Sequence, residues 1–308
     1  MKLQPIGWTT ALIALGVCFL RGGNQVALKF GLTGFSPFEG AFLRMLVGAA
    51  AVGAWTLIQR AELRIRPDER RSLLQLTLLF LVQISLLHIG ADYTSPAYAV
   101  ILINSNPIFA NFIAHFVVPE DRLSGPRVLG LGCAFVGVVF VLLGRPDLGI
   151  ARDPMLGNIT VLISGILVAA RLVYTQRLVQ RIEPTKLVFW QMVLALPGFA
   201  AAIWLMPAEP RGDVTWQALA GVAYQGAVVS GLTFMAWAIL LQRHSPGSLS
   251  VFSFTVPTFG VLLSGWLFQE ALTSRLLLGV LAVTGGIALA THAGRKAVCD
   301  AQPDGNEP

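Results

Sequence analysis

Long apolar runs separated by short polar segments occupy this chain from end to end. Ten such runs occur, at roughly residues 6–29, 37–58, 72–91, 96–118, 125–144, 155–176, 184–206, 214–241, 246–268 and 274–293. A helix needs about 20 apolar residues to cross the hydrocarbon core of a bilayer, and the runs approach or exceed this length. The pattern therefore predicts an all-α polytopic membrane protein with ten transmembrane helices.

The segments between the runs are too short to hold a soluble domain. The longest of them extends only from Gln59 to Arg71. The first run, Ile6 to Phe30, is longer than the core of a signal peptide and lacks a small-residue cleavage site, so we expect it to remain as the first span. We expect residues 296–308, after the last run, to form a disordered cytoplasmic tail.

The second half of the chain repeats landmarks of the first. A serine, two prolines and a glutamate return 150 positions later, so that Ser95, Pro96, Pro107 and Glu120 correspond to Ser245, Pro246, Pro257 and Glu270. The glycines Gly130 and Gly137 return as Gly279 and Gly286. We divide the chain into two homologous repeats at 1–150 and 151–295. Each repeat holds five runs, an odd number, so the second must enter the membrane from the opposite side, as an inverted repeat.

Composition and charge agree with a bilayer environment. Hydrophobic residues make up 55% of the 308 positions and charged residues 12%, whereas charged residues make up about 25% of a typical soluble domain. Of the 22 Lys and Arg residues, fourteen fall on one side of the predicted bundle and five on the other. Cytoplasmic loops retain such residues, which predicts that both termini face the cytoplasm of a bacterial inner membrane. The net charge of +6 is not gathered into a basic tract of the kind that binds nucleic acid.

Motifs for catalysis, metal binding and nucleotide binding are absent from the sequence. The cysteines Cys18, Cys133 and Cys299 are far apart and form no CxxC pair, so neither a metal site nor a disulfide framework is indicated. There is no GxxxxGK[ST] loop for a nucleotide and no HExxH motif. The four histidines lie at different depths. We expect no cofactor and no enzyme activity.

Arginines inside the apolar runs are the strongest candidates for a binding site. A charge in the hydrocarbon core costs at least about 2.5 kcal/mol unless it faces water or a partner. Arg21 and Arg44 lie at similar depths in the first and second runs, and Gln25 lies one helical turn beyond Arg21. Together these side chains are suited to hold a carboxylate or another anion by charge-assisted hydrogen bonds.

Structural roles compete with this interpretation. Arg44 is also placed to cap backbone carbonyls or to pair with Glu39, which would lock two helices together. Arg171, 150 positions after Arg21, is the candidate of the second repeat. It lies near the predicted inner end of its run, where a long side chain can extend to the membrane surface.

Further polar and aromatic side chains are expected to line a central cavity. Asn104, Asn111 and His115 lie seven and four residues apart and share one face of the fourth span. Unpaired amides are costly in lipid, so this face is expected to point inward, either to a substrate or to another helix. The remaining candidates hydrogen-bond or stack, and they are Gln83, Tyr174, Tyr224, Trp237 and Ser253.

Prolines, glycines and glutamates at repeated positions have expected structural roles. Pro107 and Pro257 fall within their spans, where each removes a backbone hydrogen bond and acts either as a hinge or as a static kink. The repeated glycine pairs are expected to let two helices approach closely. Glu120 and Glu270 precede the next helix and are expected to cap it.

The same residues resemble a known family. Phe19-Leu20-Arg21-Gly22, Lys29 and Ser36-Pro37 are similar to the opening of an EamA domain of the drug/metabolite transporter superfamily, and the repeated Ser-Pro, Pro, Glu and Gly series is similar to the rest. Members usually carry Trp-Gly where this chain has Leu20-Arg21-Gly22, which adds a charge. The resemblance implies that small metabolites, often amino acids, are moved outward across the bacterial inner membrane.

These observations lead to one expected function and several alternatives. We expect a secondary transporter, active as a monomer, that exports amino acids or related amphipathic compounds by alternating access through a central cavity. An uptake carrier and a proton-coupled multidrug exporter are alternatives within the class of transporters. A receptor or scaffold that transports nothing is a more remote alternative, because it would not need matched inverted repeats.

Overall fold

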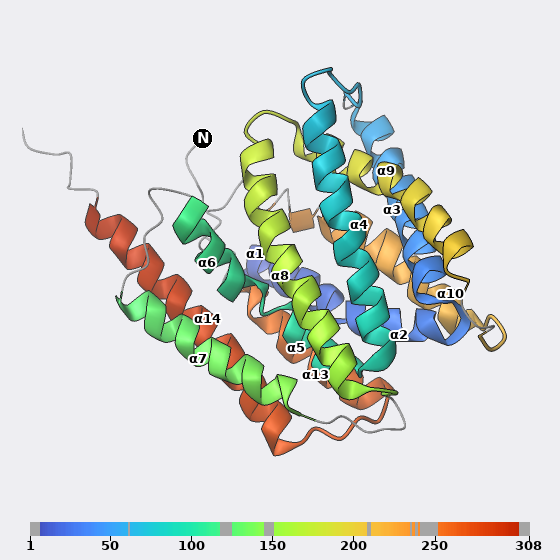
Figure 1. The fold of residues 1–308 in the computed structure, drawn as a ribbon. Coiled ribbons are helices and arrows are strands. Elements are labelled where there is room, and N and C mark those ends of the chain that lie inside the picture. Colours follow the sequence, from blue (N-terminus) through green and yellow to red (C-terminus); the bar gives the residue numbers. More distant parts are fainter. Residues whose placement is uncertain are drawn as a thin grey trace, which may run out of the picture.

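The structure is a computed structural model, and it describes residues 7–60, 62–117, 125–144, 151–207, 211–234, 236–237, 240 and 252–301. Helices make up the bundle (Figure 1). In the first half they are α1 (Trp8–Gly22), α2 (Asn24–Gly34), α3 (Pro37–Gln59), α4 (Arg70–Tyr93), α5 (Pro96–Ile103), α6 (Asn106–Val117) and α7 (Gly125–Leu142). The second half contains α8 (Pro154–Leu178), α9 (Pro184–Leu205), α10 (Trp216–Ala223), the π-helix η1 (Tyr224–Leu232), α13 (Thr255–Leu267) and α14 (Ser274–Ala301).

The helices fall within the ten apolar runs, which supports a polytopic membrane protein. Five segments are long and apolar enough to cross a membrane by themselves, namely Trp8–Gly34, Pro37–Gln59, Arg70–Tyr93, Pro154–Leu178 and Pro184–Leu205. Shorter apolar helices cover Val128–Leu142, Thr255–Leu267 and Ser274–Ala290. The number of ten spans stays a prediction. α14 continues to Ala301, so residues 296–301 are helical where a disordered tail was expected, and 302–308 lie outside the described residues.

Several helices begin with the same local signal, a capping side chain followed by proline. The pairs are Ser36-Pro37, Ser95-Pro96, Asp153-Pro154 and Glu183-Pro184, and each capping side chain accepts a backbone N–H three residues later. Proline fits the first helical position because its missing N–H would have no partner there. At α3 the Glu39 carboxylate completes a capping box by accepting the Ser36 N–H at 2.8 Å. Glu39 therefore caps its own helix, and the expected pairing with Arg44 is not formed.

Two of the apolar runs are broken near their middles. The first run divides into α1 and α2 at Gly23, and the fourth divides into α5 and α6 just before Pro107. Pro107 cannot donate to the Ile103 carbonyl, and the Asn106 side chain donates to that oxygen instead at 2.9 Å. Pro107 is expected to act as a hinge or as a kink, and in the structure the helix is fully interrupted just before it. Its counterpart Pro257 lies in the first turn of α13, where a missing N–H disrupts no helical bond.

The packing of helices is matched between the two halves. α4 packs against α8, and the equivalent helices of the opposite halves, α10 and α2, also pack together. In the same way, the packing of α3 against η1 is matched by the packing of α9 against α4. The packing of α1 against α13 is matched by the packing of α8 against α5 and α6. Three pairs are their own counterparts, α3 with α9, α5 with α13 and α7 with α14. The arrangement therefore has an approximate twofold relation between the halves.

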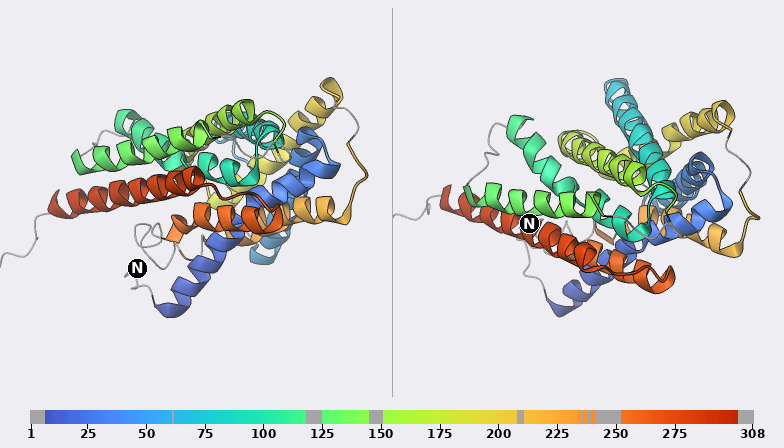
Figure 2. Two further views of the ribbon diagram at one scale, coloured as in Figure 1. Left: turned by 90° about the horizontal axis from the view of Figure 1, so that it is seen from below. Right: turned by 60° about the horizontal axis from the view of Figure 1, so that its bottom comes forward.

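The repeated glycines lie where α7 and α14 cross. These helices lie side by side along one flank of the bundle (Figure 2). A methyl group placed on Gly130 would lie 2.7 Å from the Gly286 carbonyl oxygen, and one on Gly286 would lie 2.5 Å from the Gly130 carbonyl oxygen. A methyl group on Gly137 would lie 3.0 Å from the carbonyl oxygen of Gly279. The predicted role of these glycines in close helix packing is confirmed.

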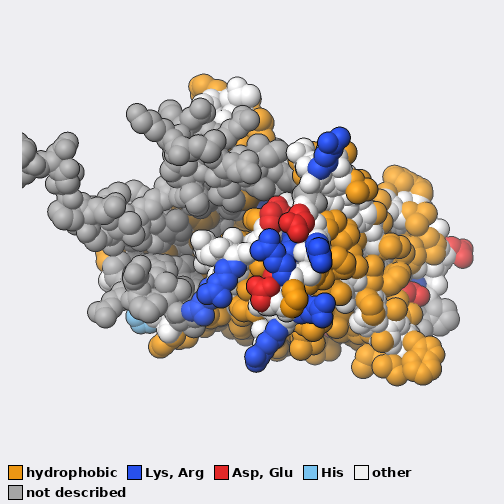
Figure 3. Space-filling model, turned by 90° about the horizontal axis from the view of Figure 1, so that it is seen from above, with side chains coloured by type: hydrophobic (Ala, Val, Ile, Leu, Met, Phe, Trp, Pro, Cys, Tyr) orange, Lys and Arg blue, Asp and Glu red, His pale blue; other side chains and the backbone are white. Residues whose placement is uncertain are grey.

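Charged side chains gather at one end of the bundle, within a hydrophobic surround (Figure 3). We call this the basic end, and it is formed by the α3–α4 connection, residues 60–69, and the α8–α9 connection, residues 179–183. Lys186 at the start of α9 forms an ion pair with Glu69 at 2.5 Å, and both side chains are buried. Burial would raise the pKa of Glu69, but the Arg66 N–H and the Lys186 ammonium together lower it. The pair ties the starts of α4 and α9 together.

We predict that an alanine at Gly286 destabilises the protein whereas an alanine at the adjacent Gly285 does not. Overpacking typically costs about 1–3 kcal/mol, and the atoms that Gly286→Ala would meet are backbone atoms, which yield little. A methyl group on Gly285 meets nothing within 4 Å, so it gains helix propensity of up to about 1 kcal/mol. Thermal unfolding in detergent measures both. Equal midpoints for the two variants would contradict the close α7–α14 crossing.

We also predict that the Glu69–Lys186 pair makes stability depend on pH. Because the folded pKa of Glu69 is lowered, its contribution is present above the ordinary value of 4.5 and is lost as the pH falls through the folded pKa. Glu69→Gln should therefore cost about 2 kcal/mol at pH 7, since it leaves a buried ammonium without its counter-ion. The unfolding midpoints of variant and wild type should converge at acid pH. A constant difference down to pH 3 would refute the assignment.

Candidate functional site

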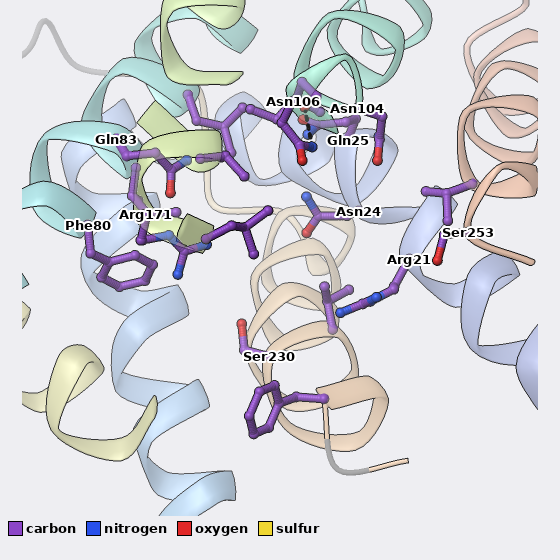
Figure 4. A pocket seen from close by; sticks show the side chains of 18 of the residues that line it. Arg21, Asn24, Gln25, Phe80, Gln83, Asn104, Asn106, Arg171, Ser230 and Ser253 are labelled. Atoms are coloured by element: carbon purple, nitrogen blue, oxygen red, sulfur yellow. Dashed lines mark hydrogen bonds between the residues drawn. The ribbon is translucent and has the colours of Figure 1, made fainter. Parts of the chain in front are cut away.

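A cavity of about 630 Å³, lined by apolar side chains and by a set of polar ones, lies between the two halves. Its walls come from α1, α2, α3, α4, α5, α6, α8, α9, η1, α13 and α14, together with neighbouring residues of the second half (Figure 4). The breaks in the first and fourth runs lie at this cavity, since Arg21, Asn24, Asn104 and Asn106 line it. Interrupted helices of this kind bring polar backbone and side-chain groups to the midplane of membrane transporters.

Most of the predicted site residues line this cavity. They are Arg21, Gln25, Arg44, Gln83, Asn104 and Ser253, together with the prolines Pro107 and Pro257. The Asn104 amide donates to the Val100 carbonyl at 2.7 Å and thus also stabilises the end of α5. The Gln83 amide donates to the Ser164 hydroxyl at 3.1 Å and leaves its oxygen without a partner.

Four predicted residues are not among those that line the cavity. Asn111 donates to the Pro107 carbonyl at 2.7 Å. Tyr174 donates to Gln75 at 2.8 Å, and Tyr224 donates to the Leu20 carbonyl at 2.6 Å. Trp237 instead stacks against Arg21, whose guanidinium carbon lies 5.4 Å from the ring centroid. These contacts join helices or support a lining residue, so we do not assign the four side chains to direct substrate contact.

Arg44 is held in the wall of the cavity by the second half. Its Nη1 donates to Gln225 of η1 at 3.3 Å, and its side chain is only 8% exposed. The Nε–H group is buried and has no partner. An unpartnered charged donor is costly unless a ligand or water accepts its hydrogen bond. Arg44 therefore retains a free donor at the cavity.

Arg171 has an equivalent arrangement on α8. Its Nη1 donates to Gln191 of α9 at 3.4 Å, and its guanidinium carbon lies 5.1 Å from the centroid of the Phe80 ring. Its Nε–H is also buried without a partner. The Arg171 side chain thus points into the cavity (Figure 4). It does not extend to the membrane surface, which was the alternative.

Sequence reasoning missed several polar residues of the cavity. Asn24, Asn106, Gln191, Ser230 and Thr284 all line it. Asn24 precedes Gln25 at the break between α1 and α2, and Asn106 stands at the break before Pro107. A polar residue next to a helix breaker inside an apolar run is the signal that would have found both. Gln191 and Ser230 carry no such signal, because they depend on how α9 and η1 turn within the bundle.

The cavity lies closer to the basic end than to the other end of the bundle. On α8 its lining residues include Arg171 and Thr175 near the end of the helix, and on α9 they include Leu187 and Gln191 near the start. Both groups adjoin the α8–α9 connection. The other end, which we call the far end, contains the last turn of α4 and the segment before α10.

An ion pair between the two halves and hydrogen bonds within the first half hold the far end together. Arg211 of the second half forms two hydrogen bonds of 2.7 Å with the Asp92 carboxylate of the first half. This contact with Asp92 raises the pKa of Arg211. The Lys29 ammonium donates to the carbonyls of Ala91, Asp92 and Thr94 at 2.7–3.0 Å. A bidentate pair of this geometry is among the stronger polar contacts between protein segments.

Glu270 adds a second tie at the far end. Its carboxylate accepts hydrogen bonds from the Ser95 hydroxyl, from the Ala97 N–H at 3.3 Å and from the Ser264 hydroxyl at 2.6 Å. Glu270 therefore caps α5 of the first half, whereas capping of the helix that follows it in the sequence was expected. Its repeat partner Glu120 lies outside the described residues, as do Ser245 and Pro246.

The basic groups of the cavity face no acidic side chain among its described lining residues. Arg21, Arg44 and Arg171 are the charged residues there, and the remaining polar lining consists of amides and hydroxyls. The ion pairs of the described chain involve Glu69 and Asp92, which lie at the two ends of the bundle. A bundle with an apolar surface around a polar internal cavity is the architecture of a membrane transporter.

Comparison with known proteins agrees with this class. The model of the EamA-like transporter family matches residues 8–143 and again 155–291, and the chain belongs to this family. The uncharacterized transporter YoaV of Bacillus subtilis is 25% identical over 90% of this chain and 94% of its own. An uncharacterized transporter of Archaeoglobus fulgidus is 22% identical over 92% of this chain and 97% of its own.

A solved structure supports the fold independently. The crystal structure of another protein covers 92% of this chain and 98% of its own, with a TM-score of 0.67 and 20% sequence identity. At this identity the likeness concerns the fold alone. The two family matches, one in each half, agree with two EamA repeats in this chain.

Proposed function

We propose that this protein is a secondary transporter that exports small metabolites bearing a carboxylate across the inner membrane of a bacterium. The observation that carries the proposal is the cavity between the halves, which presents three arginines and no acidic side chain among its described lining residues. Amino acids are the class that the resemblance to the family favours. Arg21 and Arg44 with Gln25 hold the carboxylate in this proposal, as the sequence predicts.

Alternating access between ten spans in two inverted repeats is the proposed mechanism. The matched packing of helices supports it, because equivalent contacts in the two halves can exchange roles when the halves rock against each other. The Asp92–Arg211 pair and the Glu270 tie close the far end in this conformation. With the basic end in the cytoplasm, the cavity lies nearer to the side from which an exported substrate would enter.

For a substrate of net negative charge, though not for a zwitterionic amino acid, electrical work supports export as the direction. An anion that leaves the cytoplasm moves down the inside-negative membrane potential, which contributes about 2.3 kcal/mol per charge for each 100 mV. Export of an anion therefore proceeds without a coupled proton. The described lining of the cavity offers amides, hydroxyls and guanidiniums, which suits binding of an anion better than a proton relay.

We predict that Arg21→Gln and Arg44→Gln each reduce transport at least tenfold while the protein remains folded in the membrane. Each change removes a charge-assisted hydrogen bond, and loss of about 1.4 kcal/mol corresponds to tenfold. Counterflow of labelled amino acids and organic acids into preloaded liposomes measures the effect. Arg64→Gln, at an exposed arginine of the α3–α4 connection, is the matched control. Unchanged flux in both cavity variants would remove the carboxylate assignment.

The orientation is tested separately. Leu3→Cys and Gly305→Cys, each in a variant whose native cysteines are serines, should resist a membrane-impermeant maleimide applied to intact spheroplasts and react after permeabilisation. This result follows if both termini lie in the cytoplasm. Labelling of one terminus but not the other in intact spheroplasts would mean an odd number of spans and would exclude inverted five-helix repeats.

A further inference from the structure

We infer that the preferred substrate is a short dicarboxylate, an organic anion with two separated negative groups, rather than a zwitterionic amino acid. This inference rests on the proposed function and narrows its substrate class. It comes from the number of charges in the cavity and from their distribution.

The number of charges disfavours a zwitterion. Three guanidiniums stand in the described wall without a facing carboxylate. A substrate carboxylate gains from all three, but a substrate ammonium would be repelled by all three and would find no acidic partner among the described lining residues. Two negative charges on the substrate leave the occupied cavity closer to neutral, which is favourable where water is scarce.

The distribution of charges favours two separated negative groups. Figure 4 shows Arg21 and Arg171 on opposite sides of the cavity, with Asn24 between them. We call Arg171 one pole of the cavity and Arg21 the other. One carboxylate at each pole fits this arrangement, whereas a phosphate places both charges on one group.

Unpartnered hydrogen-bonding groups support the same ligand. The Nε–H groups of Arg44 and Arg171 are buried donors without acceptors. Asn24, Gln25 and Gln83 each have a buried amide oxygen without a donor. An amide carries both donors and an acceptor, so rotation of its end group turns a donor toward a carboxylate. The amides are therefore suited to bind the body of the substrate between the poles.

The supports of the poles differ, which makes them separable by mutation. Arg171 is held by Gln191 at 3.4 Å, and the third arginine, Arg44, is held by Gln225 at 3.3 Å, so both are fixed by neutral amides from the second half. Arg21 lies against the Trp237 ring. A neutral amide does not cancel the positive charge of the arginine that it supports, so this charge stays available to the substrate.

The test compares succinate with succinamate, which has the same length but carries an amide in place of one carboxylate. Calorimetric titration of the purified protein in nanodiscs should show succinate binding at least about tenfold more tightly, because one charge-assisted contact is lost with succinamate. Asparagine should bind more weakly than either. Methyl phosphate, which carries its charges on one group, should also bind more weakly than succinate. Equal affinity for succinate and succinamate, or a preference for asparagine or methyl phosphate, would overturn the inference.

Variants of the two poles sharpen the test. Arg21→Gln and Arg171→Gln should each lower the preference for succinate over succinamate toward one, because the carboxylate at the substituted pole loses its arginine. Arg171→Lys keeps the charge and should keep the preference, and Arg64→Gln should leave it unchanged. A preference that survives both glutamine substitutions would contradict the two poles.

Counterflow in liposomes separates this inference from the proposed function. If succinate exchanges and asparagine does not, both stand. If an amino acid or a monocarboxylate exchanges in preference to succinate, the transporter stands and the dicarboxylate inference falls. If no solute of the panel exchanges in protein that is folded, the proposed function itself falls.

Discussion

The cost of placing charge inside a hydrocarbon layer governs this structure. Three guanidiniums lie within apolar runs, and each needs compensation that lipid does not supply. The protein provides it by facing them into a shared cavity and by supporting them with the amides of Gln225 and Gln191 and with the Trp237 ring. None of these supports cancels the charge. The arginines are therefore stabilised in place and remain available to an anion.

The same requirement explains where the backbone is irregular. Backbone groups freed by a helix break are costly in lipid and are tolerated where they line a protein cavity. The breaks before Asn24 and Pro107 occur at the cavity, and the Asn106 side chain satisfies the carbonyl that Pro107 leaves free. Ends of the bundle show the opposite chemistry, with full ion pairs at Glu69 and Asp92. Neutral groups thus support the arginines at the cavity, where substrate would bind, whereas ion pairs hold the ends of the bundle together.

Much of this arrangement was predictable from the sequence. Apolar runs predict the helices, because a bilayer imposes a minimum length, and the repeated glycines predict close helix packing, which the structure has where α7 and α14 cross. Arg21, Gln25 and Arg44 were found because charge inside an apolar run needs an explanation. Tyr174 and Tyr224 are not among the residues that line the cavity, since periodicity does not say whether an inward side chain meets a cavity or a neighbouring helix. The orientation of Arg171 against Phe80 and the cap that Glu270 gives to α5 depend on contacts across the halves.

The pairing of α7 with α14 has a consequence for motion. Conversion between end states of an inverted-repeat carrier exchanges the conformations of its two repeats, so a contact between α4 and α8 is replaced by its image on α10 and α2. A contact between equivalent helices is its own image and need not break. The glycine crossing of α7 and α14 can therefore stay fixed throughout the cycle, as a stationary axis around which the cavity walls turn.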